Sequence, residues 1–547
     1  MKRKILTASL AAFAVLSSVS CIKDLDALPL NPTDYTSEVA YGTELGAYIS
    51  GLSKVYSGLY DPRNATGLGN SNQGSFLGGT WLFNENSSDE MFHTGSIDTW
   101  SLTVNFDTWN EVANDLSNGI YGNAVLTITF ANEFLIQTTD EKLAARGADQ
   151  TLIDQVHSLR AEAKVIRAYC YATLIDIYGN IPFVDENTPI GKTPPVQKMR
   201  KDAFEWTVAQ LEELLAGNDL PAAGSNYPRV DRGTALATLV RLYLNAEVYT
   251  GQAMWQETKD ACERLFRLGA YELCPEYQWV FMGDNGENPA AIKEIIFANY
   301  YHYQHTSWNW GGTTLLLATA IDADLMRDGY PTGFGDSWSG SHMPTEWVER
   351  FFHPTNVNYE TGEYTIEDKR GQFFYIKGHT PDMKEGPWVF KEGWAVLKWS
   401  NLPHDVSAAD YISTAAARKF ADTDYVYIRL GEMYLAYAEA CLHLNQKAAG
   451  LPYLNALRKR AGVSEVSDYD SEFLFEEYSR ELYWEGHRRR DLIRFDKFSS
   501  ASYLWHWKGG SYEGQSFPKY KEILPIPTNE LQANENLVQN PGYADNR

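Results

Sequence analysis

Three glutamates near the carboxyl end of the chain have a spacing that could support acid–base chemistry. Glu477, Glu481 and Glu485 recur every four residues, so a helix would place their carboxyls on one face. Paired carboxylates are the groups with which glycoside hydrolases cleave sugars. The same segment also contains several arginines: Arg480, Arg488, Arg489, Arg490 and Arg494. We therefore interpret the cluster as an ion-pair network that holds the last helices together, not as a catalytic site.

Motifs of common catalytic and metal sites are missing from the sequence. It contains no His-Glu-x-x-His zinc helix, no Gly-x-Ser-x-Gly nucleophile turn and no glycine-rich phosphate loop. The run Asp284-Asn285-Gly286-Glu287-Asn288 offers oxygen ligands but lacks the spacing of a calcium loop, so we predict a turn there. We predict no catalytic residue, no metal and no cofactor. Structural calcium stays an alternative that no specific motif supports.

Aromatic residues offer a different chemistry, that of carbohydrate binding. They make up 14% of the chain, with 16 Trp and 34 Tyr, and a core cannot take all of them without leaving polar ring tips to satisfy. A sugar ring packs its C–H face on an aromatic ring, while nearby Asn, Asp and Arg side chains exchange hydrogen bonds with its hydroxyls. Exposed aromatic residues with polar neighbours would therefore form a glycan site.

Three segments of the chain combine aromatic and polar residues in this way. The candidate ligand-binding residues are Trp81, Asn84 and Trp100 in the first segment, Tyr301, Tyr303, Trp308, Asn309 and Trp310 in the second, and Asp336 and Trp338 in the third. For each aromatic residue the alternative is packing in the core. Core packing is what we expect for Trp109, which lies between Phe106 and Val112.

The first twenty residues have the pattern of a secretion signal. Three cations at residues 2–4 precede an apolar run at residues 5–19 that is too short to span a bilayer. Cys21 then stands where bacterial lipoproteins carry an acylated cysteine. We predict that residues 1–20 are removed, that Cys21 is the lipid attachment site, and that residues 21–40 form an extended tether. The alternative is ordinary signal cleavage beside a cysteine without lipid.

Charge and cysteine content restrict the partners further. The formal net charge of −24 argues against nucleic acid and against adsorption to anionic lipid, since both require clustered Lys and Arg. Besides Cys21 there are four cysteines, with no Cys-x-x-Cys pair: Cys170, Cys262, Cys274 and Cys441. A disulfide between Cys262 and Cys274 is an open alternative. We expect the others to pack as small apolar residues.

The elements that position these groups are predicted to be mainly helical. The clearest helix covers Val156–Ile177, where apolar residues recur at intervals of three and four, and Gly179 and Pro182 end it. Further helices are predicted at residues 45–59, 120–135, 204–215, 232–249, 255–268, 427–444 and 447–461. Consecutive helices with short connections form antiparallel pairs, which here resemble tetratricopeptide units.

Two stretches of the chain lack helical periodicity. Residues 64–80 are rich in Gly, Asn and Ser and are predicted to form a long loop. Between Tyr271 and Asp424, Trp, Gly, Pro, Tyr and His replace the helical pattern. Functional loops are often carried on a rigid scaffold, so we expect the ligand-binding face in this second stretch.

Several motifs, taken in order, resemble the SusD/RagB family of surface lipoproteins. Arg160–Tyr169 with the ending Tyr178-Gly179-Asn180-Ile181-Pro182 is similar to the family's Glu-x-x-x-x-Arg-Ala-x-x-Tyr helix. The late segment Glu485-Gly486-His487-Arg488, followed by Asp491-Leu492-Ile493-Arg494, resembles its Glu-Gly-x-Arg and Asp-Leu-x-Arg helix. The tail Gln539-Asn540-Pro541-Gly542-Tyr543 matches its C-terminal pattern. The resemblance covers nearly the whole mature chain.

This resemblance implies both an architecture and a function. The architecture is a single body at residues 41–547 on about four tetratricopeptide-like helix pairs, with an N-terminal part (41–270), a loop-rich ligand face (271–425) and a C-terminal part (426–547). The function is non-catalytic capture of oligosaccharide or polysaccharide at the outer face of the outer membrane. The partner is a TonB-dependent transporter of the SusC type. Residues 294–297 resemble the buried strand that precedes a ligand loop in the family.

Two other functions stay open at this point. The RagB branch of the family implies capture of peptides, which a groove with few exposed tryptophans would favour. A surface glycoside hydrolase is a remote alternative, suggested by the carboxylate-rich loops. Binding of glycan without hydrolysis, absence of glycan binding, and release of sugars would distinguish the three.

Overall fold

The structure, a computed structural model, describes most of the chain after the N-terminal segment. The described residues are 40–61, 75–94, 103–105, 107–109, 115–188, 194–306, 312–321, 325, 332–386, 389–406, 419–545 and 547. The predicted signal peptide, Cys21 and the tether up to residue 39 lie outside them. So do four of the candidate ligand-binding residues, namely Trp100, Trp308, Asn309 and Trp310.

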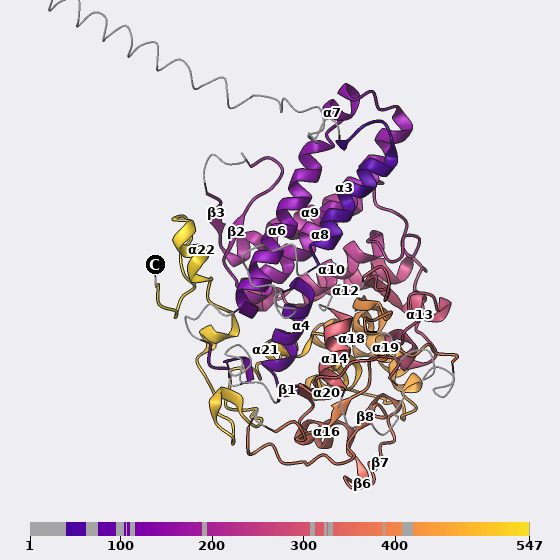
Figure 1. Cartoon of the computed structure of the whole chain (residues 1–547), viewed down its shortest axis with the longest axis vertical. Helices are drawn as coiled ribbons and strands as arrows, with labels where there is room; N and C mark the ends of the chain where they lie inside the picture. The colour runs from indigo at the N-terminus through magenta and orange to yellow at the C-terminus, as the bar shows by residue number, and fades with distance from the viewer. Residues whose placement is uncertain are drawn as a thin grey trace, which may run out of the picture.

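Helices form most of the body, as predicted (Figure 1). The α-helices are α3 (Leu45–Ser57), α4 (Phe76–Asn86), α6 (Asp115–Gln137), α7 (Asp140–Ala145), α8 (Gln150–Ile177), α9 (Arg200–Ala216), α10 (Arg232–Leu244), α11 (Ala246–Thr250), α12 (Trp255–Arg267), α13 (Pro289–Glu294), α14 (Thr313–Ala320), α16 (Thr345–Phe352), α18 (Leu430–His443), α19 (Lys447–Arg460), α20 (Ser471–Leu482), α21 (Arg488–Arg494) and α22 (Thr528–Ala533). Short 3-10 helices are η4 (Tyr277–Phe281), η5 (Lys369–Gly371), η6 (Lys508–Gly510) and η7 (Lys519–Glu522).

The described strands are short and form antiparallel pairs. The pairs are β1 (Phe92–His93) with β5 (Ser341–His342), β2 (Ile181–Phe183) with β3 (Val196–Lys198), β4 (Ile295–Asn299) with β10 (Tyr425–Arg429), β6 (Thr355–Asn358) with β7 (Glu363–Thr365), and β8 (Phe374–Tyr375) with β9 (Ala395–Val396). Every residue of β4 and β10 is buried, which confirms the buried strand predicted before the middle ligand loop.

The long helix α8 follows directly from its sequence. The Asp149 side chain caps it by accepting a hydrogen bond of 2.8 Å from the backbone N–H of Leu152. The apolar stripe is buried against α3, α6 and α9. Gly179 ends the helix at a φ of +73°, a left-handed conformation that glycine adopts without the steric penalty of a Cβ atom. Helix α8 is thus the helix on which α3, α6 and α9 of the N-terminal half pack.

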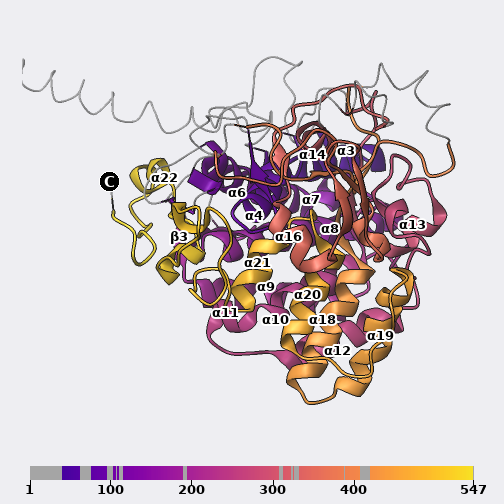
Figure 2. The ribbon, with the colours of Figure 1, turned by 90° about the horizontal axis from the view of Figure 1, so that it is seen from below.

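The main helices form a row in which each packs on the next. The order of packing is α6, α8, α9, α10, α12, α18 and α19. The step from α12 to α18 crosses the loop-rich stretch, so the C-terminal helices continue the row that the N-terminal ones begin. In Figure 2, α12, α18 and α19 lie on one side of the body, and α3, α4 and α14 on the other. Such a row agrees with the tetratricopeptide-like scaffold that was predicted.

Local details differ from the predicted boundaries. The predicted helix at residues 427–444 begins as strand β10, because residues 425–429 pair with β4 before α18 starts at Leu430. The helix predicted at 232–249 is interrupted at Asn245 between α10 and α11. The predicted end of the loop at residues 64–80 is wrong, because helix α4 already starts at Phe76. Ser75 caps this helix by accepting a hydrogen bond from the Gly78 N–H.

Two further observations concern the whole described body. Cys170, Cys262, Cys274 and Cys441 are all buried and free, so the alternative disulfide is not formed. Burial raises the pKa of the Cys262 thiol well above its ordinary value, which keeps it protonated and apolar in character. In the described part of the chain, no helix has both the length and the apolar character needed to cross a membrane.

Candidate functional site

A cluster of aromatic side chains follows strand β4 on the surface. We call residues Tyr300–His305 the aromatic loop. Its Tyr300 side chain is 44% exposed, and its ring plane lies within 8° of that of His302. His302 also stacks on His305 at a centroid distance of 4.3 Å and lies 5.0 Å from Tyr303. The loop thus gathers four aromatic rings in one surface cluster, and aromatic rings are the groups on which the C–H face of a sugar packs.

Two aspartates fix the backbone of the aromatic loop. The backbone N–H of Tyr301 donates a hydrogen bond of 2.7 Å to Asp424, and that of Tyr303 donates one of 3.0 Å to Asp422. Asp424 directly precedes β10, the partner strand of β4, and Asp422 lies two residues before Asp424. Burial raises the pKa of Asp424 to about 7, against the lowering effect of the Tyr301 N–H. The loop is therefore held by the strand pair beneath it.

The structure corrects the role predicted for Tyr301. Its side chain is only 2% exposed, and its ring packs edge-on against Tyr60 at 6.0 Å. Alternation along the extended chain explains this, because successive side chains after β4 point to opposite sides. Tyr301 therefore points into the core while Tyr300 and His302 lie at the surface. Tyr303 is half-buried and belongs to the surface cluster, as predicted.

An apolar groove adjoins the aromatic loop. It is about 200 Å³ in volume and lies between α3 and the end of β4. Ile49, Leu52, Tyr56 and Tyr60 line one side, and Pro228 and Ala298–Tyr300 line the other. Tyr300 therefore belongs both to the groove and to the stacked cluster. Of the groove residues, Tyr300 lies in the second predicted segment, whereas the residues from α3 were predicted only as part of a helix at residues 45–59.

The third predicted segment lies on the surface beside α14. Trp338 and Asp336 are both half-buried. The Trp338 backbone N–H donates a hydrogen bond of 2.7 Å to the carbonyl of Ala318 near the end of α14. Trp338 therefore has part of its ring available at the surface, held on a helix end, which agrees with its predicted place.

Hydrogen bonds bring the first and third segments together. Strand β1 pairs with β5, which starts three residues after Trp338. The Thr94 backbone N–H also donates to the Gly340 carbonyl at 2.6 Å. Thr94 is the last described residue before the segment that contains Trp100. Two of the three predicted segments, separated by about 240 residues in sequence, thus meet at one strand pair.

Trp81 and Asn84 belong to α4 and not to an exposed loop. Trp81 is 2% exposed, its ring packs on Trp484 at 5.5 Å, and its Nε1–H donates to the Trp484 carbonyl at 3.3 Å. Asn84 is 7% exposed and accepts a hydrogen bond of 3.4 Å from Arg489. The predicted exposure of both residues is corrected, because the C-terminal helix α21 packs on α4 and covers them.

A small polar cavity beside α4 does not provide an alternative site. Trp81, Asn84, Tyr169, Arg241 and Arg490 are among its lining residues, and its volume is about 60 Å³. Ligand pockets for organic molecules usually measure about 300–1,000 Å³, so a sugar ring does not fit here. The cavity has room for a few water molecules only.

The three glutamates at the C-terminal end are structural, as predicted, but of the arginines named with them Arg480 pairs with Glu477, whereas Arg488, Arg489 and Arg494 pair with carboxylates elsewhere. Glu477 and Glu481 are completely buried and Glu485 is 5% exposed. Glu481 pairs with Arg370, Arg429 and Arg460. Burial alone raises the pKa of Glu481, but these three guanidiniums lower it far below its ordinary value. A carboxylate that is permanently charged and out of contact with solvent cannot act as an acid or reach a sugar.

Glu485 is held in the same network by a buried lysine. Lys398 Nζ lies 2.5 Å from Glu485 Oε1, and Arg429 contacts the same carboxylate through Nε at 2.7 Å. Burial lowers the pKa of Lys398 to about 8, although Glu485 opposes the shift.

Trp109, for which core packing was expected, is 2% exposed and packs on Phe83.

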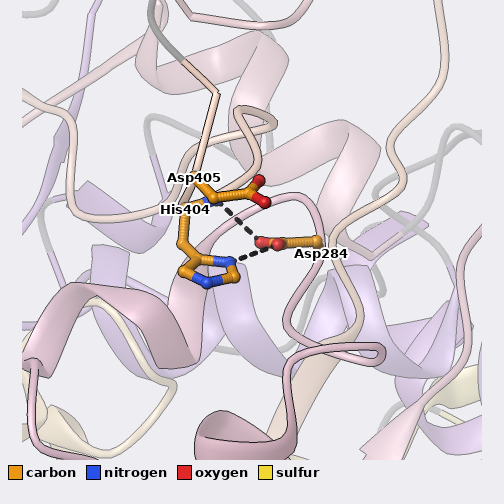
Figure 3. Close-up of side chains that lie close together, drawn as sticks. All are labelled: Asp284, His404 and Asp405. Carbon is orange, nitrogen blue, oxygen red and sulfur yellow. Dashed lines mark hydrogen bonds and ion pairs between the residues drawn. The ribbon is translucent and has the colours of Figure 1, made fainter.

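A group of metal-type ligands lies at the edge of the loop-rich region (Figure 3). Asp284, His404 and Asp405 offer ligand atoms within 4.8 Å of one another, and no other described group of three does so. Such oxygen and nitrogen donors suit a divalent cation. The Asp284 carboxylate, however, accepts from the His404 backbone N–H at 3.0 Å and lies 2.5 Å from His404 Nδ1, so protein groups already satisfy it.

The predicted turn at 284–288 is confirmed, since Glu287 N–H and Asn288 N–H both donate to the Asp284 carbonyl.

Sequence comparison relates the chain to a family of known proteins. The model of the SusD family matches residues 293–543, which include the aromatic loop and Trp338. The starch-binding protein SusD of Bacteroides thetaiotaomicron is 29% identical over 574 residues, covering 98% of each chain. The SusD-like protein P2 of Formosa agariphila is 26% identical over 440 residues, covering 75% of this chain and 79% of that one.

Solved structures have the same fold. A laminarin-binding SusD-like protein aligns with a TM-score of 0.66 at 20% identity, covering 92% of this chain and all of that one. Surface glycan-binding protein A of Bacteroides thetaiotaomicron, in complex with laminarihexaose, aligns with a TM-score of 0.66 at 20% identity, covering 90% and 99%. At this level of identity the likeness establishes the architecture alone.

Proposed function

Since the chain belongs to the SusD family, we propose that it captures an oligosaccharide or polysaccharide on the face formed by the aromatic loop and Trp338. The observation that carries this proposal is the stacked group of Tyr300, His302, Tyr303 and His305. Its rings lie at the surface on a backbone that is hydrogen-bonded to the buried Asp424 and the half-buried Asp422. We keep Asp336 and Trp338 as candidate contacts, and Trp100, Trp308, Asn309 and Trp310, which lie outside the described residues, stay candidates from the sequence.

Delivery to an importer is the second part of the proposal. Cys21 would carry the lipid that holds the protein at the outer membrane, with the folded body outside the cell. A SusC-like TonB-dependent transporter would receive the captured ligand. Because lipid attachment keeps both proteins in one membrane, capture and transfer become steps within a single assembly, with a high effective concentration of ligand at the transporter.

The proposed role is binding without catalysis. Three of the proteins named above are binding proteins by name, namely the starch-binding protein SusD, the laminarin-binding SusD-like protein and surface glycan-binding protein A, in agreement with this role. The carboxylates that first suggested hydrolysis form buried ion pairs. The hydrolase alternative therefore has no support from the Glu477–Glu485 cluster.

Capture of a peptide is the second candidate, and the apolar groove favours it. The groove is lined by aliphatic residues such as Ile49 and Leu52, and it could accept an apolar peptide side chain. A sugar exposes mainly hydroxyls at its edge and would use the ring faces of the aromatic loop instead. The two candidates thus depend on different parts of the same face.

A panel of purified polysaccharides tests the proposal. Protein that begins at residue 21, with Cys21 changed to Ser for solubility, is run by affinity electrophoresis in gels containing each glycan, and the products are analysed. Retardation without released sugar supports glycan capture. No retardation by any glycan, together with binding to a peptide library, would favour peptide capture. Released sugars would contradict the non-catalytic role.

A further inference from the structure

Asn401 is a buried polar residue at the junction of several loops. Its side chain is completely buried. It donates a hydrogen bond of 2.9 Å from Nδ2 to the Gly333 carbonyl. Its Oδ1 atom accepts from the backbone N–H groups of Asp422 at 2.7 Å and Thr423 at 3.2 Å. The amide thus uses both its donor and its acceptor on backbone groups from two different segments.

Each of these segments leads to one part of the proposed glycan face. Asp422 accepts the Tyr303 backbone N–H at 3.0 Å, so Asn401 connects to the aromatic loop through a single residue. Gly333 lies five residues before Trp338, and the Asn401 backbone N–H also donates to the Thr332 carbonyl at 3.0 Å. Asn401 therefore joins the aromatic loop to the Trp338 segment, although neither contains it.

Close packing makes this connection stiff. A Cβ atom on Gly333 would lie 2.5 Å from the Asn401 carbonyl carbon, and one on Gly283 would lie 2.3 Å from its oxygen. Backbones that approach so closely leave no room for Asn401 to move without displacing its neighbours. A shift at one segment must then be passed on to the other.

A second buried asparagine supports the same segment from another direction. Asn285 accepts the Asp424 backbone N–H at 2.9 Å and donates to the Asp424 carbonyl at 2.9 Å. Asp424 in turn accepts the Tyr301 backbone N–H. Residues 422–424 are thus fixed between two amides, and only the Asn401 amide also reaches the Trp338 segment.

We propose that Asn401 is a positioning residue that sets the placement of the aromatic loop relative to the Trp338 segment. A glycan long enough to contact both would depend on Asn401, whereas one that contacts a single ring cluster would not. This inference rests on the proposed glycan face for its effect on affinity. The mechanical coupling between the two segments follows from the hydrogen bonds alone and can be measured without ligand.

Asn401→Asp is the informative substitution, because it keeps the shape and the acceptor but replaces the Nδ2 donor to Gly333 by an oxygen. Asn455→Asp is the matched control. Asn455 on α19 makes the same pair of side-chain bonds, donating to the Val466 carbonyl and accepting its N–H, both at 2.9 Å. It lies in the C-terminal helices, outside the proposed face. If Asn401→Asp does not fold, Asn401→Ser removes the same donor without adding a charge.

Amide hydrogen exchange measured by mass spectrometry tests the coupling. We expect peptides covering residues 300–306 and 332–339 to exchange at least about tenfold faster in Asn401→Asp than in the unchanged protein, and at unchanged rates in Asn455→Asp. Acceleration in only one of the two peptides, or in neither, would overturn the coupling.

Affinity for oligosaccharides of two lengths tests the consequence for binding. The probes are the two-unit and six-unit oligosaccharides of whichever glycan retards the unchanged protein. We expect Asn401→Asp to lose about tenfold in affinity for the six-unit probe and to keep its affinity for the two-unit probe. Equal affinity for both, or equal loss for both, would contradict the positioning role. If no glycan binds the unchanged protein, the proposed function fails, while the exchange result still decides the coupling.

Discussion

Glu481 Oε1 lies 2.7 Å from Arg429 Nη1, and both side chains are fully buried. Arg429 belongs to β10, which pairs with β4 under the aromatic loop, whereas Glu481 belongs to α20 of the C-terminal helices. This ion pair therefore ties the support of the proposed glycan face to the end of the chain. It also explains why Glu481 does no acid–base chemistry, since its charge is fixed by surrounding guanidiniums.

Substituting Glu481 by Gln is expected to destabilise the protein. The change leaves three buried guanidiniums without their shared counter-charge, and breaking a buried ion pair typically costs about 3–5 kcal/mol. Urea unfolding followed by circular dichroism measures the effect. The control is Glu472→Gln, whose pair with Lys497 is largely exposed and which should change stability by less than about 1 kcal/mol. Equal stability of the two variants would contradict the structural role.

The unfolding free energy is expected to fall at alkaline pH because of Glu85. Its carboxylate accepts N–H groups of Gly486 and His487, and burial raises its pKa to about 8 from 4.5. Because the folded state holds this proton more tightly than the unfolded state, the contribution to stability is complete below about pH 4.5 and is lost as the pH rises through about 8.

Glu85→Gln keeps the acceptor but cannot ionise, so it should flatten this pH dependence between pH 5 and pH 9. Urea unfolding at several pH values provides the measurement, and a pKa of about 8 against 4.5 corresponds to a loss of unfolding free energy of up to about 5 kcal/mol by pH 9. Glu205→Gln, an exposed residue of α9, is the control and should keep the slope of the unchanged protein. A slope that persists in Glu85→Gln would assign the dependence to other groups.

Tyr300→Ala and Trp338→Ala should each weaken glycan binding about tenfold, equivalent to about 1.4 kcal/mol, because each removes a ring face. Isothermal titration calorimetry with the glycan found by the panel gives the affinity. Trp255→Ala is the control, since that ring stacks on His443 at 3.9 Å at α12, away from the aromatic loop. Unchanged affinity in both test variants would place the ligand elsewhere.

Cys21→Ala should separate binding from uptake. The purified variant is expected to bind glycan with unchanged affinity, because Cys21 is not one of the proposed glycan contacts. Cells that carry it should fail to grow on the glycan, since the protein would no longer be held beside its transporter. Growth at the normal rate would show that the lipid is dispensable.

Local patterns in the sequence were sufficient where a structure depends on neighbours along the chain. The spacing of apolar residues in Val156–Ile177 determined helix α8, and Gly179 determined its end, because both effects act within a few residues. The combination of Glu481 with nearby arginines indicated an ion-pair network, but its actual partners Arg370, Arg429 and Arg460 come from other segments and were decided by the tertiary structure. Alternation after β4 could also have separated Tyr300 from Tyr301, but only if the strand had been extended past Asn299.

Contacts between distant segments were decided by the tertiary structure alone. Trp81 is an aromatic residue with polar neighbours, which suggested a ligand contact. However, α21, about 400 residues later, packs on α4 and buries it. Residues 427–429 were predicted as the start of a helix but belong to strand β10, because β4 pairs with them through its backbone. Asn401 carries no motif at all, and its importance comes from backbone groups that only the folded chain brings within hydrogen-bonding distance.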